Sequence, residues 1–184
     1  MKPAKFSKSG GLVLWLILLL VLVGVLSYPS LSLAWFKLQE PIFRVPLGVE
    51  GSVLVRKDPY GSGLFGAKRS GRRKHRGIDL RSPIGTEVLA SKSGLAIIGK
   101  KKNGMGRYVE ILHPDGWKTL YGHLSRIDIT DRQRVRQGQV IGAVGKSGNA
   151  GHRLIQAHVH FEIWNPDQVA TNPLEQIPVE RTNR

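Results

Sequence analysis

The sequence of 184 residues contains no cysteine, and it is poor in acidic side chains. The lack of cysteine excludes disulfides and zinc sites built on thiolates, so any metal must be bound by histidine and carboxylate. Only 13 aspartates and glutamates stand against 28 lysines and arginines, which gives a net charge of +15. The first 34 residues hold three lysines and no acid, so the remainder carries +12, which is +15 less three.

The excess of positive charge predicts a polyanionic partner, such as nucleic acid, anionic lipid headgroups or an acidic cell envelope. The sequence lacks a basic helix with base-reading side chains and lacks zinc-finger spacing, so no nucleic-acid partner is expected. We therefore interpret the charge as an aid to solubility and to weak retention on an anionic surface.

Charged residues are also absent between Lys8 and Lys37, where an apolar run extends from Leu12 to Leu26. A helix in this region would be apolar on every side, which argues against the core helix of a soluble domain. We therefore predict an N-terminal transmembrane or signal helix within residues 1–36, and everything after residue 37 is expected outside the cytoplasm.

Two outcomes remain open for this N-terminal segment. Ser32-Leu33-Ala34 resembles a signal-peptide cleavage site, and Pro29 would break the helix just before it. Cleavage after Ala34 would give a secreted protein. Alternatively, residues 35–37 form an interfacial anchor, and the chain stays in the cell membrane with one span and its domain in the periplasm or cell envelope. The anchor is the favoured outcome.

Short apolar runs alternate with turn signals from Gly66 onward, and the chain has 22 glycines and 10 prolines. This pattern predicts an all-β fold, a compact antiparallel β-sheet or sandwich. The expected strands are 52–56, 77–80, 87–90, 94–99, 107–112, 117–123, 139–144 and 158–164. The expected divisions are the N-terminal segment at 1–36, a linker leading into the domain at 37–63, the domain at 64–166 and a polar C-terminal tail at 167–184.

The most informative residues are two histidines two positions apart, His158 and His160, in the last expected strand. Side chains alternate along a strand, so both imidazoles share one face with Glu162, and the apolar neighbours share the other. His75 and Asp79 are four residues apart and share a face if their segment is extended. Two nitrogen ligands, one carboxylate and an open position make a catalytic zinc site.

The sequence offers more histidines than such a site requires. His75, Asp79 and one of the His158/His160 pair can bind metal, which leaves the other histidine of the pair and His123 for proton transfer. His113 opens a hairpin turn and His152 lies in a glycine-rich loop. We expect both of these to be structural, because no ligand spacing pairs them with another donor.

Six blocks in unbroken order then resemble the lysostaphin-type zinc metallopeptidases, over about residues 64 to 164. The blocks are His75-Arg-Gly-Ile-Asp79-Leu, Ser82-Pro-Ile-Gly-Thr-Glu-Val, Gly106-Arg-Tyr-Val-Glu-Ile, Thr119-Leu-Tyr-Gly-His123-Leu, Gln137-Gly-Gln-Val-Ile-Gly-Ala-Val-Gly145 and His158-Val-His-Phe-Glu162. The order and spacing of all blocks make the resemblance specific, whereas one His-x-His would be weak.

The resemblance implies a zinc-dependent metalloendopeptidase with metal ligands His75, Asp79 and His160 and with His123 and His158 as catalytic histidines that do not bind metal. It also implies that the substrate is a stem or cross-bridge peptide of bacterial peptidoglycan. Some family members have lost ligands and act only as regulators, whereas this chain keeps all five positions.

Two other functions remain open: a non-catalytic wall-binding regulator of another hydrolase, and a general envelope protease. The sequence departs from the family in the loop at 148–157, which is longer than the short glycine-rich turn usual before the His-x-His pair. The loop leaves the choice of substrate open.

Overall fold

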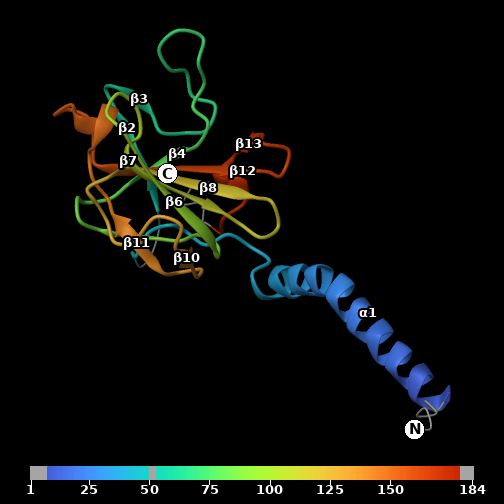
Figure 1. Cartoon of the computed structure of the whole chain (residues 1–184). Coiled ribbons are helices and arrows are strands. Elements are labelled where there is room, and N and C mark those ends of the chain that lie inside the picture. Colours follow the sequence, from blue (N-terminus) through green and yellow to red (C-terminus); the bar gives the residue numbers. More distant parts are fainter. Residues whose placement is uncertain (1–7, 50–52, 179–184) are drawn as a thin grey trace. The chain divides into compact units, whose positions relative to one another are not determined.

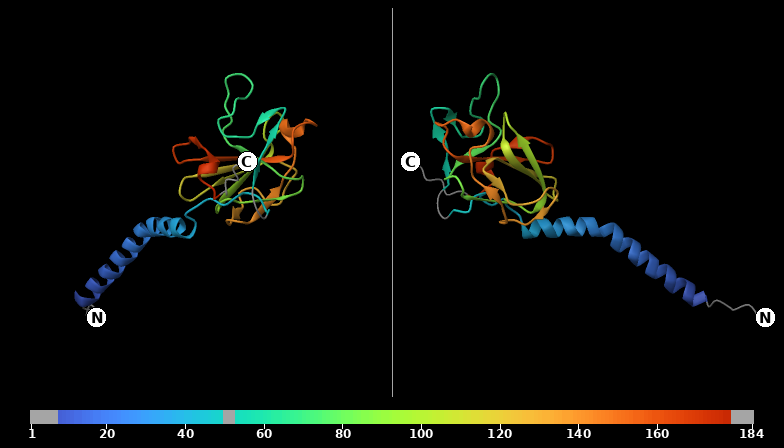
Figure 2. Two further views of the ribbon diagram at one scale, coloured as in Figure 1. Left: turned by 180° about the vertical axis from the view of Figure 1, so that it is seen from behind. Right: turned by 60° about the vertical axis from the view of Figure 1, so that its left-hand side comes forward.

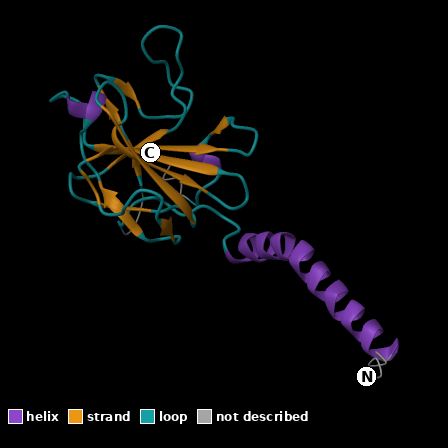
Figure 3. Cartoon of the chain, in the orientation of Figure 1, coloured by secondary structure: helices purple, strands orange, loops and turns teal. Residues whose placement is uncertain are grey.

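The structure is a computed structural model, and it describes residues 8–49 and 53–178. The chain divides into two compact units, Met1–Gln39 and Glu40–Arg184. The first contains a single described helix, and the second is a β-sheet domain with two short 3₁₀ helices, η1 (Gly148–Gly151) and η2 (Pro173–Glu175) (Figures 1 and 3). The prediction of an all-β domain with an N-terminal apolar helix is confirmed.

Helix α1 (Lys8–Gln39) continues through Pro29, so the expectation that Pro29 breaks it is wrong. Proline has no N–H to donate to the preceding turn, and the helix bends along its length (Figure 2). Two nearby serines bond back to carbonyls of the preceding turn: Ser27 Oγ donates to the Val23 oxygen at 2.8 Å and Ser32 Oγ to the Pro29 oxygen at 2.9 Å. Residues Gly11–Gln39 are long and apolar enough to span a membrane, a property that signal sequences share.

The main sheet of the domain has eight antiparallel strands, in the order β1-β4-β12-β8-β7-β6-β10, with β13 also paired to β12. Their bounds are β1 (Leu54–Val55), β4 (Ile78–Arg81), β6 (Gly94–Lys101), β7 (Gly106–Leu112), β8 (Lys118–Leu124), β10 (Arg134–Val135), β12 (His158–Trp164) and β13 (Ala170–Thr171). Strand β12 therefore lies in the middle of the sheet, between β4 and β8.

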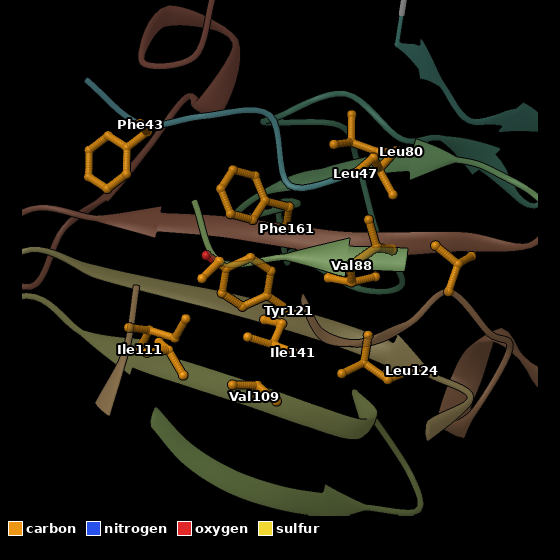
Figure 4. Close-up of a cluster of buried hydrophobic side chains, with 14 of the residues drawn as sticks. Phe43, Leu47, Leu80, Val88, Val109, Ile111, Tyr121, Leu124, Ile141 and Phe161 are labelled. Carbon is orange, nitrogen blue, oxygen red and sulfur yellow. The ribbon is translucent and has the colours of Figure 1, made fainter. Parts of the chain in front are cut away.

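A second sheet of three strands, in the order β5-β11-β9, covers one face of the main sheet. Its strands are β5 (Glu87–Leu89), β9 (Arg126–Ile127) and β11 (Val140–Ala143), and a separate hairpin joins β2 (Lys57–Asp58) to β3 (Gly61–Ser62). Tyr121 and Phe161 of the main sheet pack with Val88 and Ile141 of the second sheet in one buried cluster (Figure 4). Of the two arrangements that the sequence predicts, a sheet or a sandwich, the structure has the sandwich.

The segments on either side of the predicted domain pack onto it. Phe43 and Leu47, in the expected linker, are 5% and 4% exposed and belong to the core. Glu40 follows helix α1 directly, and its carboxylate accepts hydrogen bonds from the Ser93 amide, at 2.7 Å, and from the Ser93 hydroxyl. In the expected polar tail, β13 extends the sheet and Ile177 is 5% exposed. Apolar side chains outside the periodic strands give these segments their contacts.

Candidate metal centre

The candidate site forms on the face of the main sheet where β4 and β12 pair side by side. The antiparallel register places His160 directly opposite Asp79, so their side chains lie on the same face of the sheet. Gly77 permits the close approach, because a Cβ atom there would lie 2.2 Å from the Phe161 carbonyl oxygen. Strand β4 begins at Ile78, so His75 lies in the preceding loop rather than on the extended segment that the sequence suggested.

Three of the predicted residues bring one donor atom each to a common point. His75 Nε2 lies 3.1 Å from Asp79 Oδ1 and 2.9 Å from His160 Nδ1, and His160 Nδ1 lies 2.9 Å from Asp79 Oδ1. All three side chains are buried. Two imidazole nitrogens and one carboxylate oxygen at this spacing match the donor set of a catalytic zinc site.

The outer hydrogen bonds of both histidines favour metal binding at this point. His75 Nδ1 lies 2.9 Å from the Leu64 carbonyl oxygen, which can only accept, so Nδ1 carries the proton and Nε2 has the lone pair. His160 Nε2 lies 3.0 Å from Glu162 Oε1 and donates to it, which directs Nδ1 toward Asp79. Such partners orient metal-binding histidines and increase their basicity, so the residues present fit a divalent metal ion.

The electrostatics at this point attract a cation. Burial alone would raise the pKa of Asp79, but hydrogen bonds from His160 and His75 hold that pKa well below its usual range. Burial would lower the pKa of His160, yet its hydrogen bonds to Asp79 and Glu162 raise the pKa to about 9. His160 therefore keeps a proton on Nδ1 near neutral pH. This proton lies among the three donor atoms, where a bound metal ion would replace it.

The other two predicted histidines border the same point. The ring of His123 lies 4.9 Å from that of His158 and 5.9 Å from that of His160, measured between centroids. Burial, together with the neighbouring histidines, lowers the pKa of His123 to about 3, and burial lowers the pKa of His158. Both rings are therefore neutral near pH 7.

Each of these two rings has one nitrogen bonded to a backbone carbonyl. His123 Nδ1 donates to the Ser147 oxygen at 2.9 Å, and His158 Nδ1 donates to the Gln156 oxygen at 2.6 Å. The Nε2 atoms of His123 and His158 consequently carry the lone pairs and can accept a proton from a reacting group.

A β-bulge directs His123 into the site. The register between β7 and β8 shifts so that Gly122 and His123 together oppose Tyr108. His123 takes a φ of 63°, in the left-handed region that favours glycine. Its N–H donates to the Met105 oxygen at 2.7 Å, outside the regular ladder between β7 and β8.

The five residues line a groove of about 990 Å³. Its walls come from the loop between β3 and β4, which projects from the sheet in Figure 1, from the hairpin between β6 and β7, and from the loop before β12. His113 lies apart from this groove: it is 5% exposed and bonds to the Ser93 oxygen and Thr119 Oγ1. His152 is exposed, and its Nε2 lies 3.0 Å from the Tyr60 hydroxyl.

Sequence reasoning missed the cations that hold Asp79. Arg56 Nη2 and Arg69 Nη2 donate to Asp79 Oδ2 at 2.9 and 3.1 Å. Arg56 was hidden in the expected linker and Arg69 in a run of basic residues, where nothing in the local pattern separates a buried arginine from a solvated one. The alternation that placed Glu162 on the histidine face was a usable signal for its contact with His160.

The comparison with known families settles the assignment. The sequence pattern of Peptidase family M23 matches residues 73–173, more than half of the chain. The chain belongs to peptidase family M23. The resemblance to lysostaphin-type peptidases drawn from the sequence is thereby confirmed, and the M23 segment contains the donor residues and both neighbouring histidines.

Individual M23 relatives support this assignment. The DD-carboxypeptidase/endopeptidase Mpg of Neisseria meningitidis is 42% identical over 100 residues, which are 53% of this chain and 23% of Mpg. Stage II sporulation protein Q of Bacillus subtilis is 41% identical over 104 residues, 54% of this chain and 35% of that protein. The chain thus matches about a quarter to a third of the length of these relatives.

Among solved structures, a zinc containing peptidase from Vibrio cholerae has a similar fold. The two share 28% sequence identity with a TM-score of 0.55, and the match covers 74% of this chain and 41% of that one. The M23 fold is therefore shared, and the structure brings together the residues predicted as ligands and as catalytic histidines. Their roles remain predictions.

Proposed function

We propose that the protein is a zinc-dependent endopeptidase that hydrolyses peptide bonds in the stem or cross-bridge peptides of bacterial peptidoglycan. The observation that carries the proposal is the buried set of three donor atoms on His75, Asp79 and His160. A zinc ion held by these residues would act as a Lewis acid that polarises the scissile carbonyl and acidifies the attacking water. The name of Mpg, a DD-carboxypeptidase/endopeptidase, supports the endopeptidase activity, and that of the zinc containing peptidase from Vibrio cholerae supports the metal.

His123 and His158 are proposed to handle the proton and the developing charge. Their lowered pKa values keep both rings neutral near pH 7, so an Nε2 atom can accept a proton from the attacking water. Once protonated, the same ring can donate a hydrogen bond to the oxyanion that forms on the scissile carbonyl. The carbonyls of Ser147 and Gln156 hold the two rings in the orientation that this work requires.

The groove walls favour an anionic substrate. Six lysines and arginines line the groove against three carboxylates. The cations are Arg56, Arg69, Arg73, Lys74, Arg76 and Lys101, and the carboxylates are Asp79, Glu110 and Glu162. Peptidoglycan stem peptides carry free carboxylates, so this charge would raise their concentration at the groove.

The apolar helix supports a location of the proposed activity in the cell envelope. We propose that residues 1–36 anchor the chain in the cell membrane or act as a signal, that the peptidase domain covers about residues 64–166, and that it works outside the cytoplasm. The length and composition of Gly11–Gln39 support the anchor, with leader cleavage after Ala34 as the alternative.

A regulatory role without turnover is the second candidate. The relative that favours it is stage II sporulation protein Q, whose name describes a sporulation protein rather than a peptidase. The retained histidines argue for catalysis, since a binding module has no use for two neutral imidazoles beside a metal site.

One digestion experiment separates these functions. Purified full-length protein in detergent is incubated with purified peptidoglycan, with a chelator, and with zinc restored, and the released muropeptides are analysed by mass. We expect cleaved stem or cross-bridge peptides that vanish with chelator and return with zinc. No release in any condition would favour the regulator. Cleavage of an unstructured protein at the same rate would favour a general envelope protease.

A further inference from the structure

Arg56 occupies an unusual position for an arginine. It lies between β1 and β2, is 5% exposed, and is joined to β4 through its backbone, since its N–H donates to the Asp79 carbonyl oxygen at 2.8 Å. Its guanidinium contacts two carboxylates, Asp79 on one side and Asp58 on the other. A buried guanidinium is costly unless such partners neutralise it, so its position is fixed by both.

The first branch of this contact leads to the candidate metal ligand. Arg56 Nε and Nη2 donate to Asp79 Oδ2 at 3.2 and 2.9 Å, and Arg69 Nη2 donates to the same oxygen at 3.1 Å. Because Oδ2 is held by two arginines, the carboxylate cannot rotate, and only Oδ1 faces the nitrogens of His75 and His160.

The second branch leads to a histidine that is not a ligand. Arg56 Nη1 lies 2.6 Å from Asp58 Oδ2, and the same oxygen accepts the N–H of Gln156 at 3.0 Å. The carbonyl of Gln156 in turn accepts the Nδ1 proton of His158 at 2.6 Å. The first step is an ion pair and the next two are hydrogen bonds. The Asp58 side chain is only 2% exposed, so water does not compete for these contacts.

A further contact ties the same two segments together at the groove surface. The Tyr60 hydroxyl lies 3.0 Å from His152 Nε2, with 4.5 Å between the ring centroids. The segment of residues 56–60 therefore holds both the outer part of the 148–157 loop and the end that leads into His158.

We propose that Arg56 is a positioning residue that fixes Asp79 and His158 relative to each other, and that Asp58 is the branch serving His158 alone. The proposal rests on the proposed function for the roles of Asp79 and His158. Loss of the Asp58 contacts should affect His158 alone, whereas loss of the Arg56 contacts should affect His158 and Asp79 together. An arginine that only stabilises the fold would not separate these two effects.

The test compares Asp58→Ala and Arg56→Lys in full-length protein in detergent. Zinc affinity is measured by competition with a chromophoric chelator, and the geometry at the metal from the visible absorption of the cobalt-loaded protein. The ¹⁵N resonances of His158 report its Nδ1 hydrogen bond, and kcat and KM are measured on a cross-linked muropeptide at saturating zinc. Arg126→Lys is the matched control, because its exposed pair with Asp128 lies outside the groove.

For Asp58→Ala we expect an unchanged cobalt spectrum, zinc affinity within about threefold of wild type, altered His158 resonances and a kcat lowered about 10- to 100-fold at similar KM. For Arg56→Lys we expect a changed cobalt spectrum and zinc affinity lowered about 10- to 100-fold, in addition to the loss of kcat. The Arg126 control is expected to match wild type in every measurement.

Equal losses of zinc affinity in the Asp58 and Arg56 variants would overturn the proposal, as would His158 resonances unchanged in both. Asp58→Asn keeps the size of the side chain and carries the test of the histidine branch if Arg56→Lys does not fold. Absence of wall hydrolysis by the wild-type protein would refute the proposed function alone, because the zinc, cobalt and ¹⁵N measurements need no turnover.

Discussion

His113 and His160 are each 5% exposed, lie on the main sheet or its hairpin, and have hydrogen bonds at both ring nitrogens. Burial disfavours the charged form of both rings. His113 bonds to a carbonyl and a hydroxyl, and its pKa is lowered to about 4. His160 bonds to two carboxylates, and its pKa is raised to about 9. The partners, and not the burial, decide whether a buried histidine repels or attracts a cation.

The His113 network is internally consistent with a neutral ring. Its Nδ1 donates to the Ser93 oxygen, so Nε2 accepts the hydroxyl proton of Thr119, and Thr119 Oγ1 in turn accepts from the Tyr121 hydroxyl at 2.9 Å. The network ends where the Ser91 N–H donates to the Tyr121 oxygen at 2.8 Å. Every polar atom in this chain of hydrogen bonds has a partner, which is the arrangement of a structural histidine.

The largest expected difference between the two histidines is in activity. His160→Ala should lose zinc binding and lower wall hydrolysis by about 1,000-fold or more, because it removes a proposed ligand and leaves Asp79 and Glu162 without their shared partner. His113→Ala should retain zinc binding, and its folded fraction should retain hydrolysis. Zinc binding is measured as the zinc content of the purified variants, and hydrolysis as the release of muropeptides. Hydrolysis retained by purified His160→Ala protein would contradict the ligand assignment.

A smaller effect is expected on how the stability of the fold depends on pH, and it comes from His113. Because the pKa of His113 is lower in the folded state than its ordinary value of 6.5, protonation favours the unfolded chain. The neutral His113 ring contributes fully to the free energy of unfolding above about pH 6.5. This contribution is lost as pH falls toward 4, and the difference in pKa between the two states corresponds to about 3 kcal/mol.

The measurement is denaturant unfolding of wild type and His113→Gln across that pH range. The variant should be less stable near neutral pH, and the gap should narrow by about the same 3 kcal/mol on acidification, since Gln has no proton to gain. The exposed His152→Gln is the matched control for the loss of a histidine outside the core. A gap for His113→Gln that stays constant with pH would show that its proton is not linked to folding.

The smallest effect comes from making the partners of His160 resemble those of His113. Glu162→Gln replaces the carboxylate that accepts from His160 Nε2 with a neutral amide of the same shape. Zinc affinity should fall about 10- to 100-fold, as is usual when an outer partner of a metal-binding histidine is changed. Chelator competition measures the affinity. An unchanged value would show that Asp79 alone orients the ring.

The sequence predicts the long strands well, because apolar residues that alternate with period two over seven positions are typical of a strand and do not fit a helix. Strand β12 runs from His158 to Trp164, the predicted range, with Val159 and Phe161 fully buried on the core side. The two-residue strands β2, β3, β9, β10 and β13 carry no such signal, since two residues show no period. Their positions depend on contacts with distant parts of the chain.

The residues of the candidate site likewise divide into those with a local sequence signal and those without one. Alternation alone places His158 and His160 on one face of their strand, and the motif order joins them with His75, Asp79 and His123. The register that sets Asp79 opposite His160 appears only in the structure. Arg56 could not be found, because its burial depends on Asp79, 23 residues further along the chain. A charged side chain with a distant partner has no local pattern, and the same holds for Asp58 and Gln156.

The positive φ of His123 has a consequence for how such a protein changes over generations. A side chain other than glycine in this region costs about 1 to 3 kcal/mol, and only the imidazole gives a reason to keep it. Glycine at position 123 would relieve the backbone, but it would also remove the ring and its hydrogen bond to the Ser147 oxygen. Under the proposed function, a histidine kept at this strained position is what selection for turnover would produce.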